Sequence, residues 1–159
     1  MLFSSLVFLW LFLPAVFFLC MALKKTSWKN ILLLAASLFF YGWGEPKYVN
    51  LMILSIGINY LFGLLAKQSR FVTVAAVAVN LGILGYFKYF NFLLELLAAV
   101  FGRELLTPRE IALPIGISFY TFQALSYVLD VHRGTIKPQK SIWKLALYIS
   151  FFPQLIAGP

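Results

Sequence analysis

Long apolar runs separated by short polar or turn-forming segments dominate the chain. The runs cover residues 3–23, 30–43, 48–66, 71–89, 111–131 and 142–157. As a helix that rises about 1.5 Å per residue, roughly 20 residues cross the ~30 Å hydrocarbon layer of a bilayer. The pattern therefore predicts an all-α, multi-pass transmembrane bundle of about five to six membrane segments, which form a single domain over residues 1–159.

Two apolar stretches depart from a simple membrane crossing. Residues 92–101 are too few to cross, so we expect a short interfacial or re-entrant helix near the outer surface, with Glu95 facing water. In the last stretch, Pro153 removes a helical hydrogen bond and predicts a kink or break. The candidate helix-breaking residues are Pro153, Gly158 and Pro159. Because little apolar length remains there, we expect the chain to be the N-terminal part of a longer protein.

Composition supports a membrane location. Hydrophobic residues make up 62% of the chain and charged residues only 11%. A soluble domain has about 25% charged residues, so this chain could not cover a globular surface with polar groups. No basic residue precedes Phe3, which argues against a cleavable signal peptide and favours a retained first span.

Basic residues are distributed unevenly between alternate connections. If the spans alternate, one side of the membrane receives Lys24, Lys25, Lys29, Lys67, Arg70, Arg133, Lys137, Lys140 and Lys144. The other side receives four basic residues together with four of the five acidic residues. The positive-inside rule then makes the basic side cytoplasmic and places the N-terminus outside. The basic cluster after residue 132 could hold phosphates of a coenzyme or lipid headgroup, although any cytoplasmic loop has this composition.

Polar residues between positions 113 and 134 form one stripe on the predicted helix. At 100° per residue, a single arc contains Gly116, Tyr120, Gln123, Tyr127 and Asp130. The stripe extends about 21 Å, and polar side chains at bilayer depth avoid lipid. It therefore faces other helices or a water-filled cavity. Two interpretations stay open at this point, namely hydrogen-bonded packing between helices and one wall of a substrate path.

The chain lacks the common motifs of metal binding and nucleophilic catalysis. It contains no CxxC, no histidines at metal-binding spacing, no GxSxG and no glycine-rich phosphate loop. The single histidine, His132, opens a basic loop, and we interpret it as an interfacial residue rather than a general base. Asn59 and Asn80 lie within spans and predict hydrogen bonds between helices. We assign no catalytic residue, metal ligand, bound cofactor or nucleic-acid partner.

Four stretches resemble the membrane-bound O-acyltransferase family. They are residues 38–63, residues 80–94, the segment LPIGISFYTFQALSYVLDVHRG and the segment LYISFFPQLIAGP. The resemblance implies a multi-pass enzyme of the bacterial cytoplasmic (inner) membrane whose helices surround a tunnel. Such an enzyme takes an acyl group, here an acetyl group, from a cytoplasmic thioester donor such as acetyl-CoA. It delivers the group toward an extracytoplasmic polysaccharide such as alginate.

The resemblance also assigns roles within this chain. In the family the base is a histidine downstream of the FFPQLIAGP-like stretch, beyond the residues present here. His132 stands where the family's YxxDxxRG-like run has an aromatic residue, so catalysis is not assigned to it. Tyr120, Gln123 and Tyr127 are expected to line or support the tunnel, and Asp130 its cytoplasmic mouth. We therefore expect no turnover from this chain alone.

Two functions from other classes stay open. A non-catalytic scaffold would use this half-bundle to bind a partner or lipid. A transporter would hold its site at the membrane midplane among broken helices, but it usually shows repeats and a deep ionisable residue, and the sequence has neither. The partners expected for the acyltransferase are membrane lipids, the cytoplasmic donor and extracytoplasmic acyl-transfer or polysaccharide-modifying proteins.

Overall fold

The computed structural model describes residues 6–67, 69–101 and 113–157, except for the side chains of residues 91, 98, 100, 101, 156 and 157. Every regular element within this part of the chain is helical. In order these elements are the π-helix η1 (Phe8–Phe12), α1 (Leu13–Ala22), α2 (Thr26–Gly44), α3 (Val49–Ala66), α4 (Arg70–Phe101), α5 (Ile117–Arg133), α6 (Ile142–Ser150) and α7 (Phe152–Ala157). The all-α bundle predicted from the sequence is confirmed.

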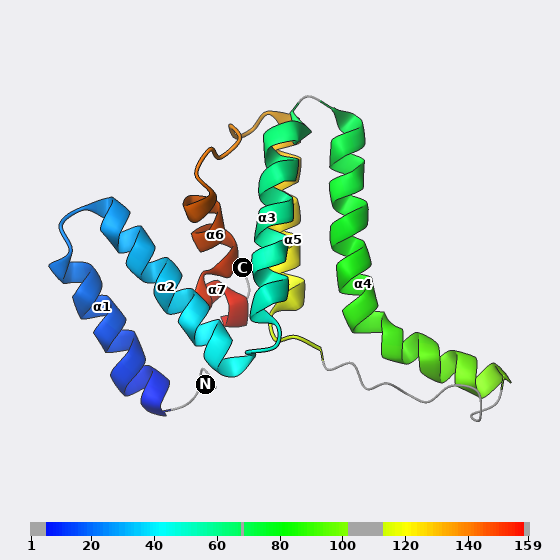
Figure 1. Cartoon of the computed structure of the whole chain (residues 1–159), viewed down its shortest axis with the longest axis horizontal. Helices are drawn as coiled ribbons and strands as arrows, with labels where there is room; N and C mark the ends of the chain where they lie inside the picture. Colours follow the sequence, from blue (N-terminus) through cyan, green and yellow to red (C-terminus); the bar gives the residue numbers. More distant parts are fainter. Residues whose placement is uncertain (1–5, 68, 102–112, 158–159) are drawn as a thin grey trace.

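Helix α5 is the centre of the bundle. It packs mainly against α3 and α4 and also contacts α6 and α7. Helix α2 covers α6 and α7 and forms a hairpin with α1 at the far edge (Figure 1). The residues on α5 that face these neighbours are almost fully buried, among them Tyr120, Ala124 and Val128. The core of the molecule therefore surrounds α5.

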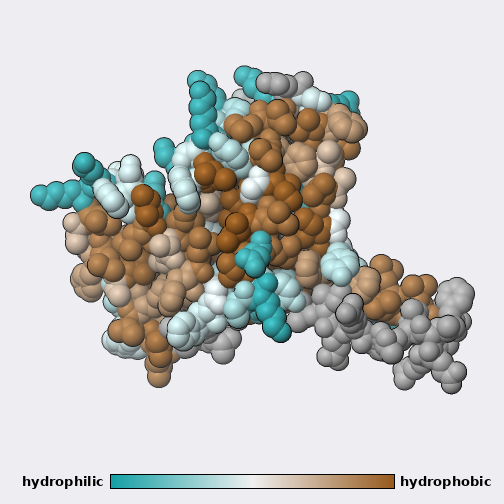
Figure 2. Space-filling view, in the orientation of Figure 1, coloured by the Kyte–Doolittle hydropathy of each residue, from teal (hydrophilic) through white to brown (hydrophobic). Residues whose placement is uncertain are grey.

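The connections rich in basic residues gather on one side of the molecule. The ends of α1, α3 and α5 and the starts of α2, α4 and α6 all lie at the upper side of Figure 1, and the α2–α3 connection lies at the lower side. Figure 2 shows hydrophobic residues over the middle of this face, hydrophilic residues along its upper edge and a further hydrophilic group at its lower side. By length and apolarity, Val49–Ala66 and Arg70–Phe90 could each cross a membrane, and Phe8–Ala22 is a shorter apolar helix.

The start of α5 differs from the prediction. We expected a helix over residues 111–131, but the described chain becomes helical only at Ile117. Gly116 precedes it in the left-handed conformation, with φ of 75°. A β carbon on Gly116 would also lie 2.9 Å from the carbonyl oxygen of Leu155. Glycine is thus required where α5 begins against α7, because other residues rarely adopt this conformation.

Helix α4 corrects a second boundary. We expected a span over residues 71–89 and a separate short helix over 92–101, whereas α4 is one helix of 32 residues. No proline or glycine separates the two parts, so the helical hydrogen bonds continue. The last part bends away from the bundle (Figure 1). Glu95 is exposed there, as expected.

The break predicted near Pro153 occurs two residues earlier. Helix α6 ends at Ser150, and Phe151 turns the chain with ψ of 112° before α7 begins at Phe152. Pro153 therefore occupies the first turn of α7, where its missing N–H is not needed. The other predicted breaking residues, Gly158 and Pro159, lie outside the described part of the chain.

Candidate functional site: a polar centre at the helix break

The break between α6 and α7 separates two backbone groups that would pair in a continuous helix. In that helix the Phe152 N–H would donate to the Tyr148 carbonyl oxygen, four residues before it. Instead, the Phe152 N–H donates to the Ser37 hydroxyl of α2 at 3.3 Å. The Tyr148 carbonyl accepts from the Gln123 side-chain amide of α5 at 2.7 Å. Side chains from two other helices thus replace one lost backbone hydrogen bond.

The same two side chains make further hydrogen bonds. Gln123 Nε2 also donates to Gln154 Oε1 of α7 at 2.8 Å. The Ser37 hydroxyl donates to the Leu33 carbonyl at 2.7 Å while it accepts from Phe152. Irregular backbone at membrane depth requires partners of this kind, since lipid offers none. We call the set of Ser37, Gln123, Gln154 and the break the polar centre.

Two buried tyrosines lie beside each other between α2 and α5. Tyr41 is 5% exposed and Tyr120 is fully buried. The two phenol groups interact with each other, and no other described group is a hydrogen-bond partner for either hydroxyl. A buried hydroxyl without a partner costs about 1–3 kcal/mol. This part of the bundle therefore keeps unused hydrogen-bonding capacity.

A pocket of about 510 Å³ adjoins the polar centre. Its walls come from α5, α6 and α7, and its lining residues are Phe119, Phe122, Gln123, Ser126, Tyr148 and Gln154. The volume lies within the ~300–1,000 Å³ range of small-molecule sites, which are mostly apolar with a few polar groups. Gln123 and Gln154 belong both to the pocket wall and to the polar centre, so the pocket has hydrogen-bonding groups at one wall.

The residues of the predicted stripe on α5 lie in different surroundings. Gly116 lies at the start of the helix, Tyr120 lies beside Tyr41 of α2, and Gln123 belongs to the polar centre. Tyr127 is buried, its ring lies against Gly63 of α3, and its hydroxyl accepts from the Gln139 N–H at 3.0 Å. Tyr120, Gln123 and Tyr127 contact groups outside α5, as expected for a stripe that avoids lipid. Its role as a tunnel wall stays a prediction.

The C-terminal end of α5 leads into the α5–α6 connection, which is rich in basic residues. The Asp130 carbonyl accepts hydrogen bonds from the backbone N–H groups of Thr135 at 3.0 Å and Ile136 at 3.4 Å. Gly134 closes the helix in the left-handed conformation, with φ of 79°. Asp130 is half-buried, and its observed contacts are those of a helix terminus. Its predicted place at a tunnel mouth is compatible with this position and stays a prediction.

His132 has a structural role in this arrangement. Its Nδ1 lies 3.0 Å from the carbonyl oxygen of Ala66, the last residue of α3. A carbonyl can only accept, so Nδ1 carries the proton in this contact. The bond joins the end of α5 to the end of α3 on the basic side. This geometry agrees with an interfacial histidine.

Asn59 and Asn80 form the predicted contact between helices. Asn59 Nδ2 donates to Asn80 Oδ1 at 3.0 Å, and Asn80 Nδ2 donates to Asn59 Oδ1 at 2.8 Å. The remaining amide hydrogens bind carbonyls of the same helices, at Ser55 and Ala76. Both residues are 1% exposed. The prediction of an inter-helix hydrogen bond is confirmed.

Two residues of the polar centre, Ser37 and Gln154, and the neighbouring Tyr41 were not identified from the sequence. Ser37 and Tyr41 lie four residues apart on α2, which places them on one helix face at bilayer depth. Gln154 follows Pro153 directly, so it is polar at a predicted break. A search for polar residues on every span, rather than on residues 113–134 alone, would have found all three.

The polar centre is suited to binding and positioning. Within the described ranges, no three His, Cys, Asp or Glu residues come together as metal ligands. The amide, hydroxyl and carbonyl groups present can donate or accept hydrogen bonds at neutral pH without changing charge. The centre can therefore stabilise a helix break and orient a polar group of a ligand in the adjoining pocket.

Comparison with known proteins gives matches to bacterial O-acetyltransferases that extend over all of this chain. The chain is 42% identical to a probable alginate O-acetylase, AlgI, of Azotobacter vinelandii, aligned over all of the chain and 34% of that relative. The AlgI of Pseudomonas aeruginosa is also 42% identical, with 32% of its length covered. A peptidoglycan O-acetyltransferase of Helicobacter pylori is 31% identical, with 36% covered. The chain thus spans about a third of the length of these curated relatives. No family model and no solved structure matches it.

Proposed function

The chain belongs to the membrane-bound O-acyltransferase family, and from this premise we propose that it forms part of an enzyme that O-acetylates an extracytoplasmic polysaccharide. The named relatives act on alginate and on peptidoglycan, and both of these contain sugar hydroxyl groups. The reaction that these relatives' names share supports a polysaccharide acceptor. Alginate is the acceptor suggested by the higher identity to AlgI.

The observation that supports this function best is the polar centre beside the 510 Å³ pocket. An acyl group that crosses a bilayer needs polar groups at depth that do not face lipid. Gln123 places an amide at such a position, between a broken helix and the pocket wall. In this proposal Gln123 and Tyr120 support the path of the acyl group. Tyr127 binds the α5–α6 connection through Gln139, and Asp130 lies at the cytoplasmic end of the path.

The protein is a membrane protein, and we propose a multi-pass arrangement in the bacterial inner membrane with the N-terminus outside. The basic connections gather on one side of the bundle, which supports a cytoplasmic location for that side (Figure 1). The donor is then a cytoplasmic thioester such as acetyl-CoA. Proteins that modify polysaccharides outside the membrane are the proposed partners on the opposite side.

Donor-dependent acetyl transfer in membranes tests the proposal. We expect a full-length relative to transfer labelled acetyl groups to alginate and the 159-residue chain alone to transfer none. Replacing the glutamine that corresponds to Gln123 by leucine in the relative should lower the rate while the protein still inserts into the membrane. If acetyl transfer continued at the parental rate, Gln123 would contribute only to helix packing. Transfer by the relative to no polysaccharide would favour a scaffold.

A further inference from the structure

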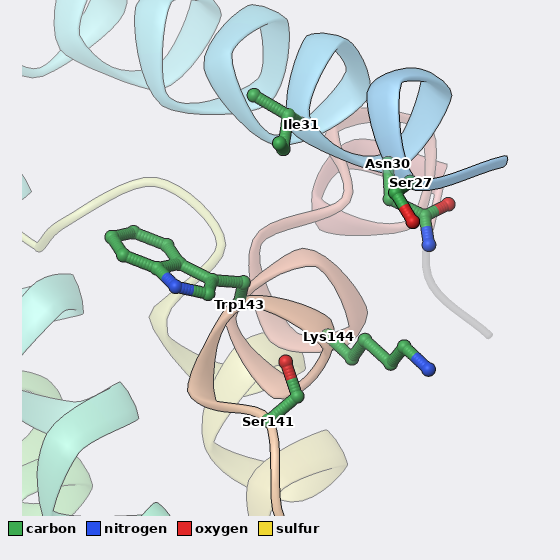
Figure 3. Close-up of a pocket in the computed structure, with 6 residues that line it drawn as sticks. All are labelled: Ser27, Asn30, Ile31, Ser141, Trp143 and Lys144. Carbon is green, nitrogen blue, oxygen red and sulfur yellow. The ribbon is translucent and has the colours of Figure 1, made fainter. Parts of the chain in front are cut away.

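A second pocket, of about 280 Å³, lies on the basic side of the molecule. It forms where the first turns of α2 and α6 meet, and its lining residues are Ser27, Asn30, Ile31, Ser141, Trp143 and Lys144 (Figure 3). Figure 3 shows Trp143 and Ile31 on one side, with Ser27, Asn30 and Lys144 toward the other. The pocket is distinct from the polar centre, which contains none of these residues.

Charge favours an anion in this pocket. Lys144 contributes a full positive charge at its wall. The first turns of α2 and α6 contain no acidic residue, and neither N-cap makes a side-chain capping bond. Helix N-termini present free N–H groups and a partial positive charge, which stabilise phosphate. The hydroxyl and amide groups of Ser27, Asn30 and Ser141 add donors suited to phosphate oxygens.

The rest of the pocket is apolar and open. Trp143 is 68% exposed and Ile31 is 52% exposed. Tryptophan and cationic side chains at the end of a membrane helix are typical of the headgroup layer. A free phosphate compound would leave these two apolar side chains in water, whereas a lipid would cover them. The site therefore combines a phosphate-binding end with an acyl-chain-binding wall.

We propose that this pocket binds the phosphate headgroup of an anionic phospholipid, with the lipid chain along Ile31 and Trp143. The site requires the membrane location but does not depend on the proposed acetyl transfer. A lipid bound here would join α2 to α6. These are the helices whose opposite ends hold Tyr41 and the α6–α7 break.

Quenching of tryptophan fluorescence by lipid tests the site. Trp143 becomes the only tryptophan when Trp10, Trp28 and Trp43 are replaced by phenylalanine. The full chain in detergent micelles is titrated with brominated phosphatidylglycerol or brominated phosphatidylcholine. We expect phosphatidylglycerol to quench at about fivefold lower concentration, since one lysine near an anionic headgroup contributes about 1 kcal/mol.

Matched charge variants locate the binding. Lys144→Gln should raise the half-quenching concentration of phosphatidylglycerol about fivefold. Lys137→Gln removes the same charge from an exposed residue outside the pocket and should change it less than about twofold. Asn30→Ala serves as a second pocket variant and should weaken quenching in the same direction. Circular dichroism checks that each variant keeps its helix content.

Three outcomes would overturn the proposal. Equal quenching by the two lipids would show that the headgroup charge is not recognised. Equal effects of Lys137→Gln and Lys144→Gln would reduce the pocket to a general cationic surface. Displacement of phosphatidylglycerol by inorganic phosphate or coenzyme A at millimolar concentration would assign the phosphate chemistry to a soluble ligand and would exclude the lipid.

Discussion

The molecule contains two polar clusters inside the bundle, and their side chains find different kinds of hydrogen-bond partner. Between α3 and α4, Asn59 and Asn80 exchange two hydrogen bonds and bind carbonyls of their own helices. At the polar centre, Ser37 and Gln123 instead bind backbone groups of a third and fourth element that a helix break has freed. The asparagine pair joins two intact helices. The polar centre replaces a bond that the backbone itself has lost.

The difference suggests which cluster serves structure alone. Each asparagine amide finds its partners inside the pair, and both residues are 1% exposed, so the pair offers no group to a ligand. Gln123 is only half-buried, and together with Gln154 it forms part of a pocket wall. The polar centre is therefore the cluster in which a ligand could compete for or extend existing hydrogen bonds. Four changes test this distinction, in decreasing order of expected effect.

The start of α5 should be the most sensitive position near the polar centre. Gly116→Ala should destabilise the protein by about 2–3 kcal/mol, because left-handed backbone costs about 1–2 kcal/mol and the new β carbon approaches the Leu155 carbonyl. Thermal unfolding in detergent measures the loss. Gly134→Ala is the matched control, since Gly134 is also left-handed but has open space around it. Equal losses would remove the α5–α7 contact from the explanation.

Gln123 should affect function more than the asparagine pair does. Gln123→Leu, made at the corresponding position of a full-length relative, should reduce acetyl transfer about tenfold, or ~1.4 kcal/mol, because the Tyr148 carbonyl and Gln154 lose their shared donor. Asn59→Leu should leave the rate per folded molecule within about twofold. Rates are normalised to the protein recovered in membranes. A larger loss from Asn59→Leu would reverse the comparison.

Ser37 should contribute to stability through a backbone group. Ser37→Ala leaves the buried Phe152 N–H without its acceptor and should cost about 1 kcal/mol. Ser126→Ala removes an exposed hydroxyl that donates to the Gln123 carbonyl and should change stability by less than about 0.5 kcal/mol. Unfolding in detergent by denaturant distinguishes them. If both variants unfold at the same midpoint, the Ser37 bond adds nothing.

The asparagine pair should show the smallest net effect when it is removed completely. Asn59→Leu alone leaves Asn80 buried without its partner and should cost about 1 kcal/mol. The double variant Asn59→Leu/Asn80→Leu removes both polar groups and should recover to within about 0.5 kcal/mol of the parent. A double-mutant cycle of unfolding free energies measures the coupling. Additive losses would mean that the two amides do not interact.

Much of the fold and part of the candidate site could be predicted from the sequence. The apolar runs predicted the helices, and the polar residues within them predicted inter-helix hydrogen bonds at Asn59 and Asn80 and a polar stripe on α5. That the two asparagines bind each other was not predicted. Helix boundaries were less predictable, at Gly116 and within α4. The need for glycine at position 116 depends in part on Leu155 of α7, whose carbonyl oxygen leaves little space for a β carbon. Local composition contains no information on that contact.

Local sequence by itself determined which segments are helical and which residues avoid lipid, because helix period and side-chain polarity act over a few neighbouring residues. Tertiary structure decided which groups those residues bind. The hydrogen bond from Phe152 to Ser37 joins positions 115 residues apart, and the bond from Gln123 to the Tyr148 carbonyl joins positions 25 residues apart. Such partners exist only once α2, α5, α6 and α7 have packed. The freed N–H donates to, and the freed carbonyl accepts from, the side chains that this packing brings within reach.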